Sequence, residues 1–343
     1  MKYDFRIDIL RNFIKIGEAY AESVSIRYNY TAEVMKGIQF QLEKVKMSSG
    51  LELDMFKDRV RPVLIHDGTE TSLGIYMIMA APKTVSDTVD FITVEGYDET
   101  MIVKQATFVQ RTFFAAGTKY LDIVQTLLGR LGFGNIRVDS SNATLPTDLE
   151  AAVGDNYLTF INGLLDSINF QHLYADSFGT LNVRQSVNPT TPSFVYSDRG
   201  PNYSAIGSIK TSTDIYDLPN VVIGLWSSPD ADEPVMFKTV NDDPISIIST
   251  VNRGYEVVKI VELRNAVTEQ NLKDYVERIA FEAMQATEII TFATNAEGGH
   301  EPNTAIQLDT EDIRGLFIEK EWNMTISQDK FEMSHVAERK LFV

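Results

Sequence analysis

The chain has 343 residues, of which 44% are hydrophobic, and it carries a formal net charge of −17 at pH 7. Because single cores stop growing at roughly 250–300 residues, this length predicts two or three folded domains. The negative charge argues against binding nucleic acid through phosphate contacts, which require a basic surface. Cysteine is absent, which excludes disulfides, thiolate nucleophiles and cysteine-ligated metal sites.

No segment predicts export or membrane insertion. Charged and apolar residues alternate in the first ten residues, MKYDFRIDIL, where a secretion signal would have a continuous apolar stretch. The longest apolar run, residues 75–81, is far shorter than the roughly 20 residues that span a bilayer. The acidity is instead typical of a surface or channel that repels polyanions and lets them pass.

Apolar residues recur with a period of two through the first 112 residues, as they do in strands with one buried face. Three such alternating sets are Tyr3, Phe5, Ile7 and Ile9; Val24, Ile26, Tyr28 and Tyr30; and Ile38, Phe40 and Leu42. Turn-forming residues at 48–50 and 67–68 separate the runs. We predict that residues 1–112 form an antiparallel β-barrel or sandwich.

Residues 113–188 predict a small α/β module. From Thr118 the apolar residues lie on one face of a helix, which Gly132 can end in a left-handed conformation. A second helix is predicted from about Asn156. Residues 173–183 then predict a hairpin, with its turn at Asp176-Ser177-Phe178-Gly179.

A proline-rich segment at residues 188–192 marks the boundary to a second β domain, predicted over residues 189–343. Strand-like apolar runs return there, at residues 221–225, 257–261 and 322–326. One helix, at about residues 268–288, interrupts them, with Thr268 as N-cap and a hydrophobic staple between Val267 and Leu272. Its expected buried stripe comprises Leu272, Tyr275, Val276, Ile279, Ala283 and Met284.

Few residues form a pattern typical of catalysis or metal binding. The spacing of the four histidines along the sequence does not match that of metal ligands. They are His66, His172, His300 and His335. The acidic group Asp230, Asp232 and Glu233 lacks the glycine and the closing glutamate of a calcium loop. Both sets therefore predict surface or structural roles.

Three other motif fragments have structural explanations. The glycines between residues 129 and 134 follow a helix, whereas a dinucleotide-binding loop follows a strand. Residues 241–244, Asn-Asp-Asp-Pro, are typical of a turn in which side chains cap their own backbone before proline. The pair Glu22-Ser23, also found in lytic transglycosylases, leads into an alternating run and so does not predict the helix that such a site needs.

Several segments, in this order, resemble the baseplate hub proteins of bacteriophage tails. The similarity is to the hub family of contractile tails in phages and prophages of Gram-positive bacteria, which is related to late control protein D. The segments extend over nearly the whole chain and are SVSIRYNYTAEVMKGIQFQL (23–42), DMFKDRVRP (54–62), LGIYMI (73–78), VEGYDET (94–100), AGTKYLDIVQTLL (116–128), YADSFGTLNV (174–183), LPNVVIG (218–224), the turn at 241–244 and MSHVAERKL (333–341).

The resemblance implies a mainly β chain with two antiparallel, tube-forming barrels and the α/β module between or beside them. It also implies a homotrimer, in which the two barrels of each subunit build a pseudo-sixfold ring. Such a ring adapts a sixfold tail tube to a threefold spike and encloses part of the central channel. The implied partners are the tail tube protein, the spike protein, the tape measure protein and other baseplate proteins. The implied location is the virion, after assembly in the bacterial host cytoplasm.

The sequence therefore predicts a non-enzymatic, structural hub of a phage tail or of a phage-derived contractile particle such as a tailocin. It predicts no catalytic, cofactor-binding or metal-binding residue, no cofactor, no specific nucleic-acid binding and no membrane insertion. Hubs of some other systems are fused to a lysozyme or spike domain, and we expect none here.

Two alternatives remain open at this point. A tail-associated peptidoglycan hydrolase would bring acidic side chains together in a deep cleft. A carbohydrate-binding receptor module would expose aromatic residues along a groove, with Trp226 and Trp322 as candidates. Both tryptophans lie in apolar runs, which favours positions in a core.

Overall fold

The computed structural model describes residues 2–47, 53–85, 90–134, 136–187, 189–199, 204, 206–226, 235–262 and 269–341, and these are mainly β. The chain forms two compact units. Unit 1 comprises Met1–Ser208 and Phe292–Val336, and unit 2 comprises Ile209–Thr291 and Ala337–Val343. Within the described ranges, every helix is too short or too polar to cross a bilayer.

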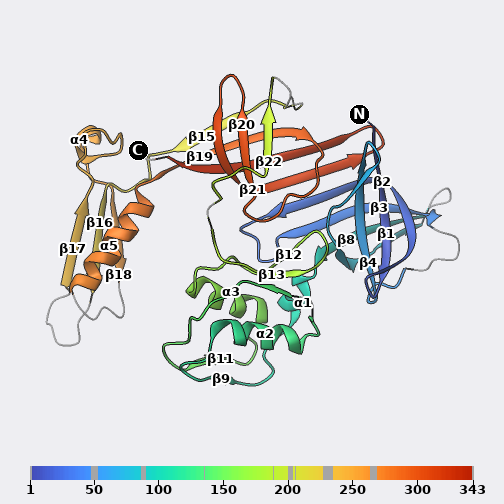
Figure 1. Cartoon of the computed structure of the whole chain (residues 1–343), viewed down its shortest axis with the longest axis horizontal. Helices are drawn as coiled ribbons and strands as arrows, with labels where there is room; N and C mark the ends of the chain where they lie inside the picture. Colours follow the sequence, from blue (N-terminus) through green and yellow to red (C-terminus); the bar gives the residue numbers. More distant parts are fainter. Residues whose placement is uncertain are drawn as a thin grey trace. The chain divides into compact units, whose positions relative to one another are not determined.

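Six strands of unit 1 close into an antiparallel barrel, drawn from blue to cyan in Figure 1. Their order is β1-β4-β6-β8-β3-β2, and β2 pairs back with β1. This ring confirms the predicted antiparallel barrel. Its strands are β1 (Tyr3–Arg11), β2 (Ile14–Asn29), β3 (Lys36–Met47), β4 (Asp58–His66), β6 (Tyr76–Ala80) and β8 (Asp90–Asp98), and the short strands β5 (Thr69–Ser72) and β7 (Lys83–Val85) pair with β4 and β8.

The barrel core follows from the alternation in the sequence. Side chains two residues apart point to the same side of a strand, so each apolar set fills the interior. Most of the predicted inward residues are at most 4% exposed, namely Ile7, Ile9, Val24, Ile26, Tyr28, Ile38, Phe40 and Leu42, whereas Tyr3, Phe5 and Tyr30 are partly buried. The register of the six strands therefore builds a hydrophobic core inside the ring, and this core continues onto residues of the neighbouring C-terminal strands.

The α/β module lies in unit 1 and contains the two predicted helices and the predicted hairpin. The first helix ends where Gly132 adopts a φ of +85°, and Asn156 caps the second by accepting from the Thr159 amide at 2.9 Å. A short helix at Thr100–Gln105 was not predicted. The elements are α1 (Thr100–Gln105), α2 (Tyr120–Arg130), α3 (Tyr157–Ser167), β9 (Thr112–Phe114), β10 (Ile136–Val138), β11 (Leu149–Ala151), β12 (Tyr174–Ala175) and β13 (Leu181–Val183).

Strand β2 belongs to two neighbouring parts of the sheet. Its first half closes the barrel against β1, and its second half pairs with β21 from Ser23↔Ser327 to Asn29↔Glu321. The sheet continues from β21 through β22, β19 and β15, and β20 and β14 pair beside β21. These strands are β14 (Phe194–Ser197), β15 (Lys210–Asp214), β19 (Ala286–Asn295), β20 (Ala305–Asp309), β21 (Arg314–Ser327) and β22 (Phe331–Leu341). Closure of these strands into a second barrel, like the predicted domain boundaries, stays a prediction.

In unit 2, helix α5 packs on the three-stranded sheet β17-β16-β18. Leu272 and Val276 of the predicted stripe are buried against Val222. The helix ends at Ala283, so the prediction of a helix to residue 288 was wrong, because Ala286 begins strand β19. The predicted cap Thr268 and staple residue Val267 lie outside the described residues. The elements are β16 (Val221–Trp226), β17 (Val235–Val240), α4 (Thr250–Arg253), β18 (Val258–Glu262) and α5 (Glu269–Ala283).

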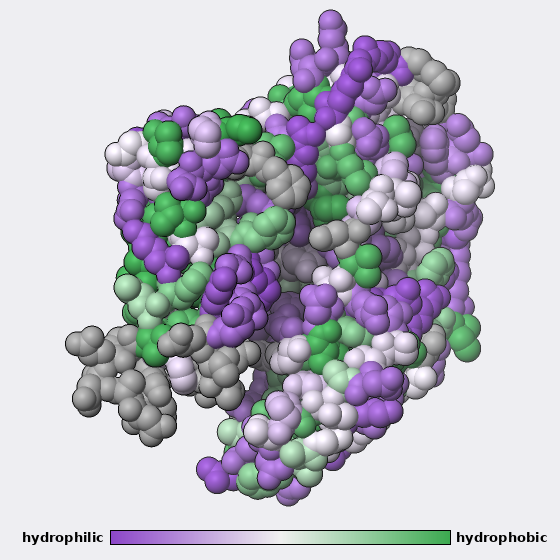
Figure 2. Space-filling view, turned by 60° about the vertical axis from the view of Figure 1, so that its left-hand side comes forward, coloured by the Kyte–Doolittle hydropathy of each residue, from purple (hydrophilic) through white to green (hydrophobic). Residues whose placement is uncertain are grey.

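The surface mixes hydrophilic and apolar residues. On the face drawn in Figure 2, the apolar residues form small, separate patches among hydrophilic ones. Some large apolar side chains are strongly exposed, among them Phe56 at 93% and Ile245 at 87%. Single exposed apolar residues are common in folded proteins, so these positions alone do not define a binding surface.

Candidate functional site

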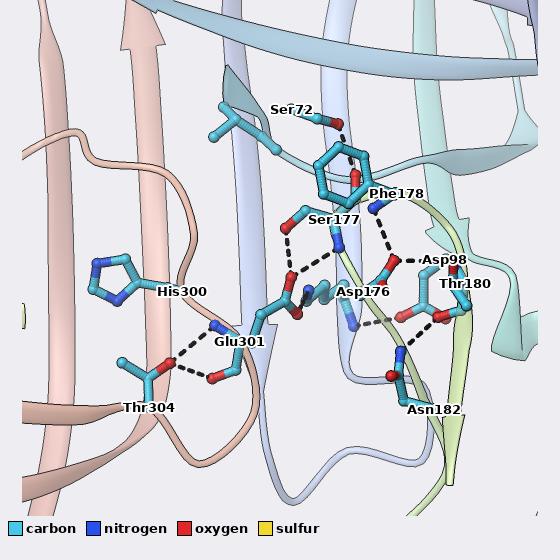
Figure 3. Close-up of polar contacts among 12 residues, drawn as sticks. Ser72, Asp98, Asp176, Ser177, Phe178, Thr180, Asn182, His300, Glu301 and Thr304 are labelled. Atoms are coloured by element: carbon cyan, nitrogen blue, oxygen red, sulfur yellow. Dashed lines mark hydrogen bonds and ion pairs between the residues drawn. The ribbon is translucent and has the colours of Figure 1, made fainter. Parts of the chain in front are cut away.

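The hairpin of the α/β module is held by charged groups from two other parts of unit 1 (Figure 3). Glu301, in the loop between β19 and β20, accepts hydrogen bonds from the Ser177 amide at 2.8 Å and the Ser177 hydroxyl at 2.5 Å. Its other carboxylate oxygen lies 2.6 Å from the Lys36 ammonium group, at the start of β3. The Lys36 side chain is 3% exposed and that of Glu301 is 30% exposed, so the ammonium group of this ion pair is buried and the carboxylate is partly open to water. One carboxylate thus connects the hairpin, the barrel and the β19–β20 loop.

Asp176 shapes the turn that Glu301 holds. Its Oδ1 atom accepts from the amides of Phe178 and Thr180, both at 2.9 Å, and Gly179 takes a φ of +77°. Aspartate side chains often fold turns in this way, because they replace backbone acceptors. The Ser72 hydroxyl, at the end of β5, donates to the Ser177 carbonyl at 2.7 Å. The turn is therefore fixed from both sides.

Asp98, the last residue of β8, is a second buried carboxylate beside this junction. Its oxygens accept from the Lys36 amide at 3.1 Å and from the Thr100 amide at 2.8 Å. Burial raises the pKa of Asp98, although these hydrogen bonds act in the opposite direction. The carboxylates of the junction are occupied by hydrogen bonds within the chain. The arrangement suits a rigid connection between parts of the fold.

An open depression of about 470 Å³ lies on the outer face of β8, β3, β2, β21 and β22. Arg27 donates to the Tyr97 hydroxyl at 3.0 Å, and Asn29 donates to the Glu321 carboxylate at 2.7 Å. A second carboxylate of the lining, Glu95, lies 3.5 Å from the Gln39 amide nitrogen. The depression is a mixed polar surface that spans the junction of the barrel with β21.

The four histidines occupy three kinds of environment. His66 stacks on Tyr3 with ring centroids 4.3 Å apart, and His172 lies 3.1 Å from Asp166. His300 and His335 are buried, and both contact Glu319 on β21. Sequence spacing missed this cluster, because the pairing of β21 with β22 and the loop before β20 bring the three residues together.

The remaining motif fragments lie in a strand, in a turn and outside the described residues. Glu22-Ser23 lies within β2, as its alternating context predicted. Asn241 and Asp243 accept from the backbone amides two residues later, which confirms the predicted self-capped turn. The acidic group at residues 230–233 lies outside the described residues.

The two tryptophans pack in cores. Trp322 is 5% exposed and stacks on Tyr28 with ring centroids 5.8 Å apart. Trp226 is partly buried and packs against the cluster around Val222 and Val276. Trp322 borders the open depression described above, but its side chain is almost wholly buried, and Trp226 packs on a core cluster, so neither presents the exposed aromatic face that carbohydrate stacking would require.

No protein-family model and no curated protein matches the sequence, but several solved structures match its fold. A tail protein from Neisseria meningitidis MC58 aligns over 98% of this chain and 96% of its own, with a TM-score of 0.68 and 13% identity. The 43 kDa tail protein of prophage MuSo2 from Shewanella oneidensis covers 98% of both chains, with a TM-score of 0.67 and 9% identity.

A third match is the c3393 protein of E. coli, described as a type VI secretion component with structural similarity to the T4 tail proteins gp27 and gp5. It covers 98% of this chain and 76% of its own, with a TM-score of 0.54 and 10% identity. Likeness at such low identity shows a shared fold. The chain has the fold of these phage tail proteins, which agrees with the resemblance found in the sequence.

Proposed function

We propose that the chain is a non-enzymatic structural hub of a phage tail or of a phage-derived contractile particle. The observation that carries the proposal is the fold, which matches tail proteins over nearly the full length of both chains. The continuous β2–β21 pairing supports it, because this pairing joins a closed barrel to a second strand ladder. The buried polar junction around Glu301 supports a rigid assembly part in the same way.

The hub acts as a homotrimer in this proposal. Residues 1–112 supply one barrel per subunit, residues 113–188 supply the α/β module, and residues 189–343 supply a second barrel that closes in the assembly. Three subunits then form a pseudo-sixfold ring between a sixfold tube and a threefold spike. Closed rings satisfy exposed strand edges, which would otherwise pair with other chains.

The partners in this proposal are the tail tube, spike, tape measure and other baseplate proteins. The ring assembles in the host cytoplasm and becomes part of the virion baseplate, with its channel open to the genome or to an effector. The net charge of −17 supports such a channel, since an acidic wall does not retain nucleic acid.

Immunogold electron microscopy of particles from the producing strain tests this role. Antibodies against the chain should label one end of each tail, at the baseplate. Label along the whole tube, or tails without label, would contradict the hub role. Purified chain should leave cell-wall preparations intact, and clearing of peptidoglycan would show that the chain has an enzymatic role.

A further inference from the structure

His300, Glu319 and His335 form a buried cluster in unit 1. Their side chains are 1%, 0% and 0% exposed. The Nδ1 atom of His300 lies 2.7 Å from one carboxylate oxygen of Glu319, and the Nδ1 atom of His335 lies 2.6 Å from the other. Among the described residues, no lysine or arginine forms an ion pair with Glu319. The buried carboxylate therefore needs positive charge from another source.

The other ring nitrogen of each histidine faces a hydroxyl group. Nε2 of His335 lies 2.9 Å from the Thr294 hydroxyl, and Nε2 of His300 lies 3.1 Å from the Tyr196 hydroxyl. Each hydroxyl also has an acceptor of its own. Thr294 donates to the Asn295 carbonyl at 2.9 Å, and Tyr196 donates to the Glu297 carboxylate at 3.2 Å.

The number of hydrogens decides which ring nitrogens carry protons. A hydroxyl has one hydrogen, so a hydroxyl that donates to its own acceptor must accept from the histidine Nε2–H. Both Nε2 atoms then carry hydrogen, and in a neutral imidazole the Nδ1 atom is left with a lone pair. Two Nδ1 lone pairs would therefore face two carboxylate oxygens at 2.6–2.7 Å. Such acceptor pairs repel each other unless they share a proton or a metal ion.

Protons are a poor source of that charge here. A protonated Glu319 has one hydrogen and could donate it to only one of the two Nδ1 atoms. Two imidazolium rings could donate to both carboxylate oxygens, but they would place two positive charges beside a single buried carboxylate. One divalent cation, in contrast, would be bound by both imidazole nitrogens and the carboxylate, with the 2.6–2.7 Å separations widening to those of ligands about 2.0 Å from a shared ion.

We propose that His300, Glu319 and His335 bind one divalent transition-metal ion, of which Zn²⁺ is the best fit. Neutral imidazole nitrogen and carboxylate oxygen are both zinc ligands, and the three residues offer ligand atoms that all lie within 4.8 Å of one another. The hydroxyls of Tyr196 and Thr294 orient the imidazoles, as outer-shell partners do at metal sites. This site departs from the sequence-based expectation that the chain binds no metal.

The surroundings favour a structural role for the ion. Phe194 stacks on His300 with ring centroids 3.9 Å apart, and Phe292 stacks on His335 at 4.6 Å. These rings and the burial of all three side chains keep the site away from solvent. The ion would tie β21 and β22 to the loop before β20, and it would enter during folding.

Refolding with and without metal tests the proposal. The full-length, untagged chain is unfolded in denaturant with EDTA and refolded either with Zn²⁺ or with EDTA, then desalted. We expect about one zinc per chain by elemental mass spectrometry, and a melting temperature at least about 3 °C higher with zinc, since a ligand of the folded state raises stability. Refolding with Co²⁺ should give visible absorption bands of a nitrogen-coordinated ion.

Matched variants locate the ion. His335→Gln and Glu319→Gln should each lose the bound zinc and the zinc-dependent rise in melting temperature. His172→Gln, at an exposed histidine paired with Asp166, should keep both. Zinc-free wild-type protein with the same melting temperature in both buffers and no cobalt bands would overturn the proposal, and it would mean that the hydroxyls donate to Nε2 instead. The wild-type measurements decide the question even where a variant does not fold.

Discussion

Asp8 is a buried carboxylate in the barrel wall, and three cations surround it. Arg6, Lys15 and Arg61 lie 2.9, 2.8 and 2.6 Å from its oxygens. Burial alone would raise the pKa of Asp8, but the hydrogen bonds from Lys15, Arg61 and Arg6 lower it. A carboxyl group whose pKa is lowered by folding stabilises the fold above its unfolded pKa of 3.8, and this stabilisation is lost as the pH falls further.

We expect Asp8→Asn to lower the free energy of unfolding by about 3 kcal/mol at pH 7, because three cations lose their buried partner. The deficit should shrink as the pH falls below about 4, where Asp8 of the wild type becomes protonated. Urea unfolding of both proteins between pH 7 and 3 measures this. Glu22→Gln, an exposed carboxylate on β2, is the control and should change little. A deficit that stays constant with pH would contradict the electrostatic explanation.

Glu301 offers a second test at the level of single residues. Glu301→Gln weakens the ion pair with Lys36, which is 3% exposed, and disturbs the two hydrogen bonds from Ser177. We expect a loss of about 2 kcal/mol and faster hydrogen exchange at residues 176–180, since a buried ammonium loses its partner. Hydrogen-exchange mass spectrometry measures the local effect, with the exposed Glu311→Gln as control. Unchanged exchange in the hairpin would mean that Asp176 and Ser72 fix the turn without Glu301.

The Glu301 junction and the Glu319 cluster show how much of a site could be predicted from single residues of the sequence. The turn at residues 176–179 was predictable, because aspartate and glycine carry local signals for turns. The partners of Glu301 and the cluster around Glu319 were not. Their contacts join residues 124 positions apart in one case and 16 to 19 positions apart on separate elements in the other. Sequence spacing carries no signal for such contacts.

At the level of elements, the contact of helix α5 with β16 depends on Gly224. A Cβ atom at this position would lie 2.1 Å from Cγ2 of Val276. We expect Gly224→Ala to destabilise the protein by about 1–3 kcal/mol, because the helix must move away from the sheet. Gly129, on the exposed face of α2, has no atom within 4 Å of such a Cβ. Gly129→Ala should therefore stabilise the protein by up to about 1 kcal/mol.

Thermal and urea unfolding of both alanine variants tests this contrast, since the same substitution should act with opposite sign. Equal effects at the two positions would show that close packing against Val276 does not restrict the size of the side chain at residue 224.

Periodicity predicted the elements whose signals are local. Helices α2 and α3 followed from apolar residues at helical spacing, and β1, β2 and β3 from alternation. Strands β14 and β20 were missed, because they pair in parallel across more than 100 residues and have short apolar runs. Helix α5 was predicted too long, since residues after Ala283 have both helical and strand-like spacing, and pairing of β19 with β15 favours the strand.

At the level of the whole molecule, the order of motifs along the chain predicted the fold better than periodicity did. Periodicity predicted β domains around an α/β module, whereas the resemblance to baseplate hubs predicted the particular fold that tail proteins share. The proposed ring of three subunits rests on the resemblance alone, because contacts between chains leave no periodic signal in one sequence. The central claim is therefore about assembly.

Negative-stain electron microscopy of the purified chain tests that claim most directly. The sample is imaged over a range of concentrations, alone and mixed with the tail tube protein. We predict rings with a central channel and threefold or pseudo-sixfold symmetry. Channel-free monomers at every concentration, with and without the tube protein, would contradict the account.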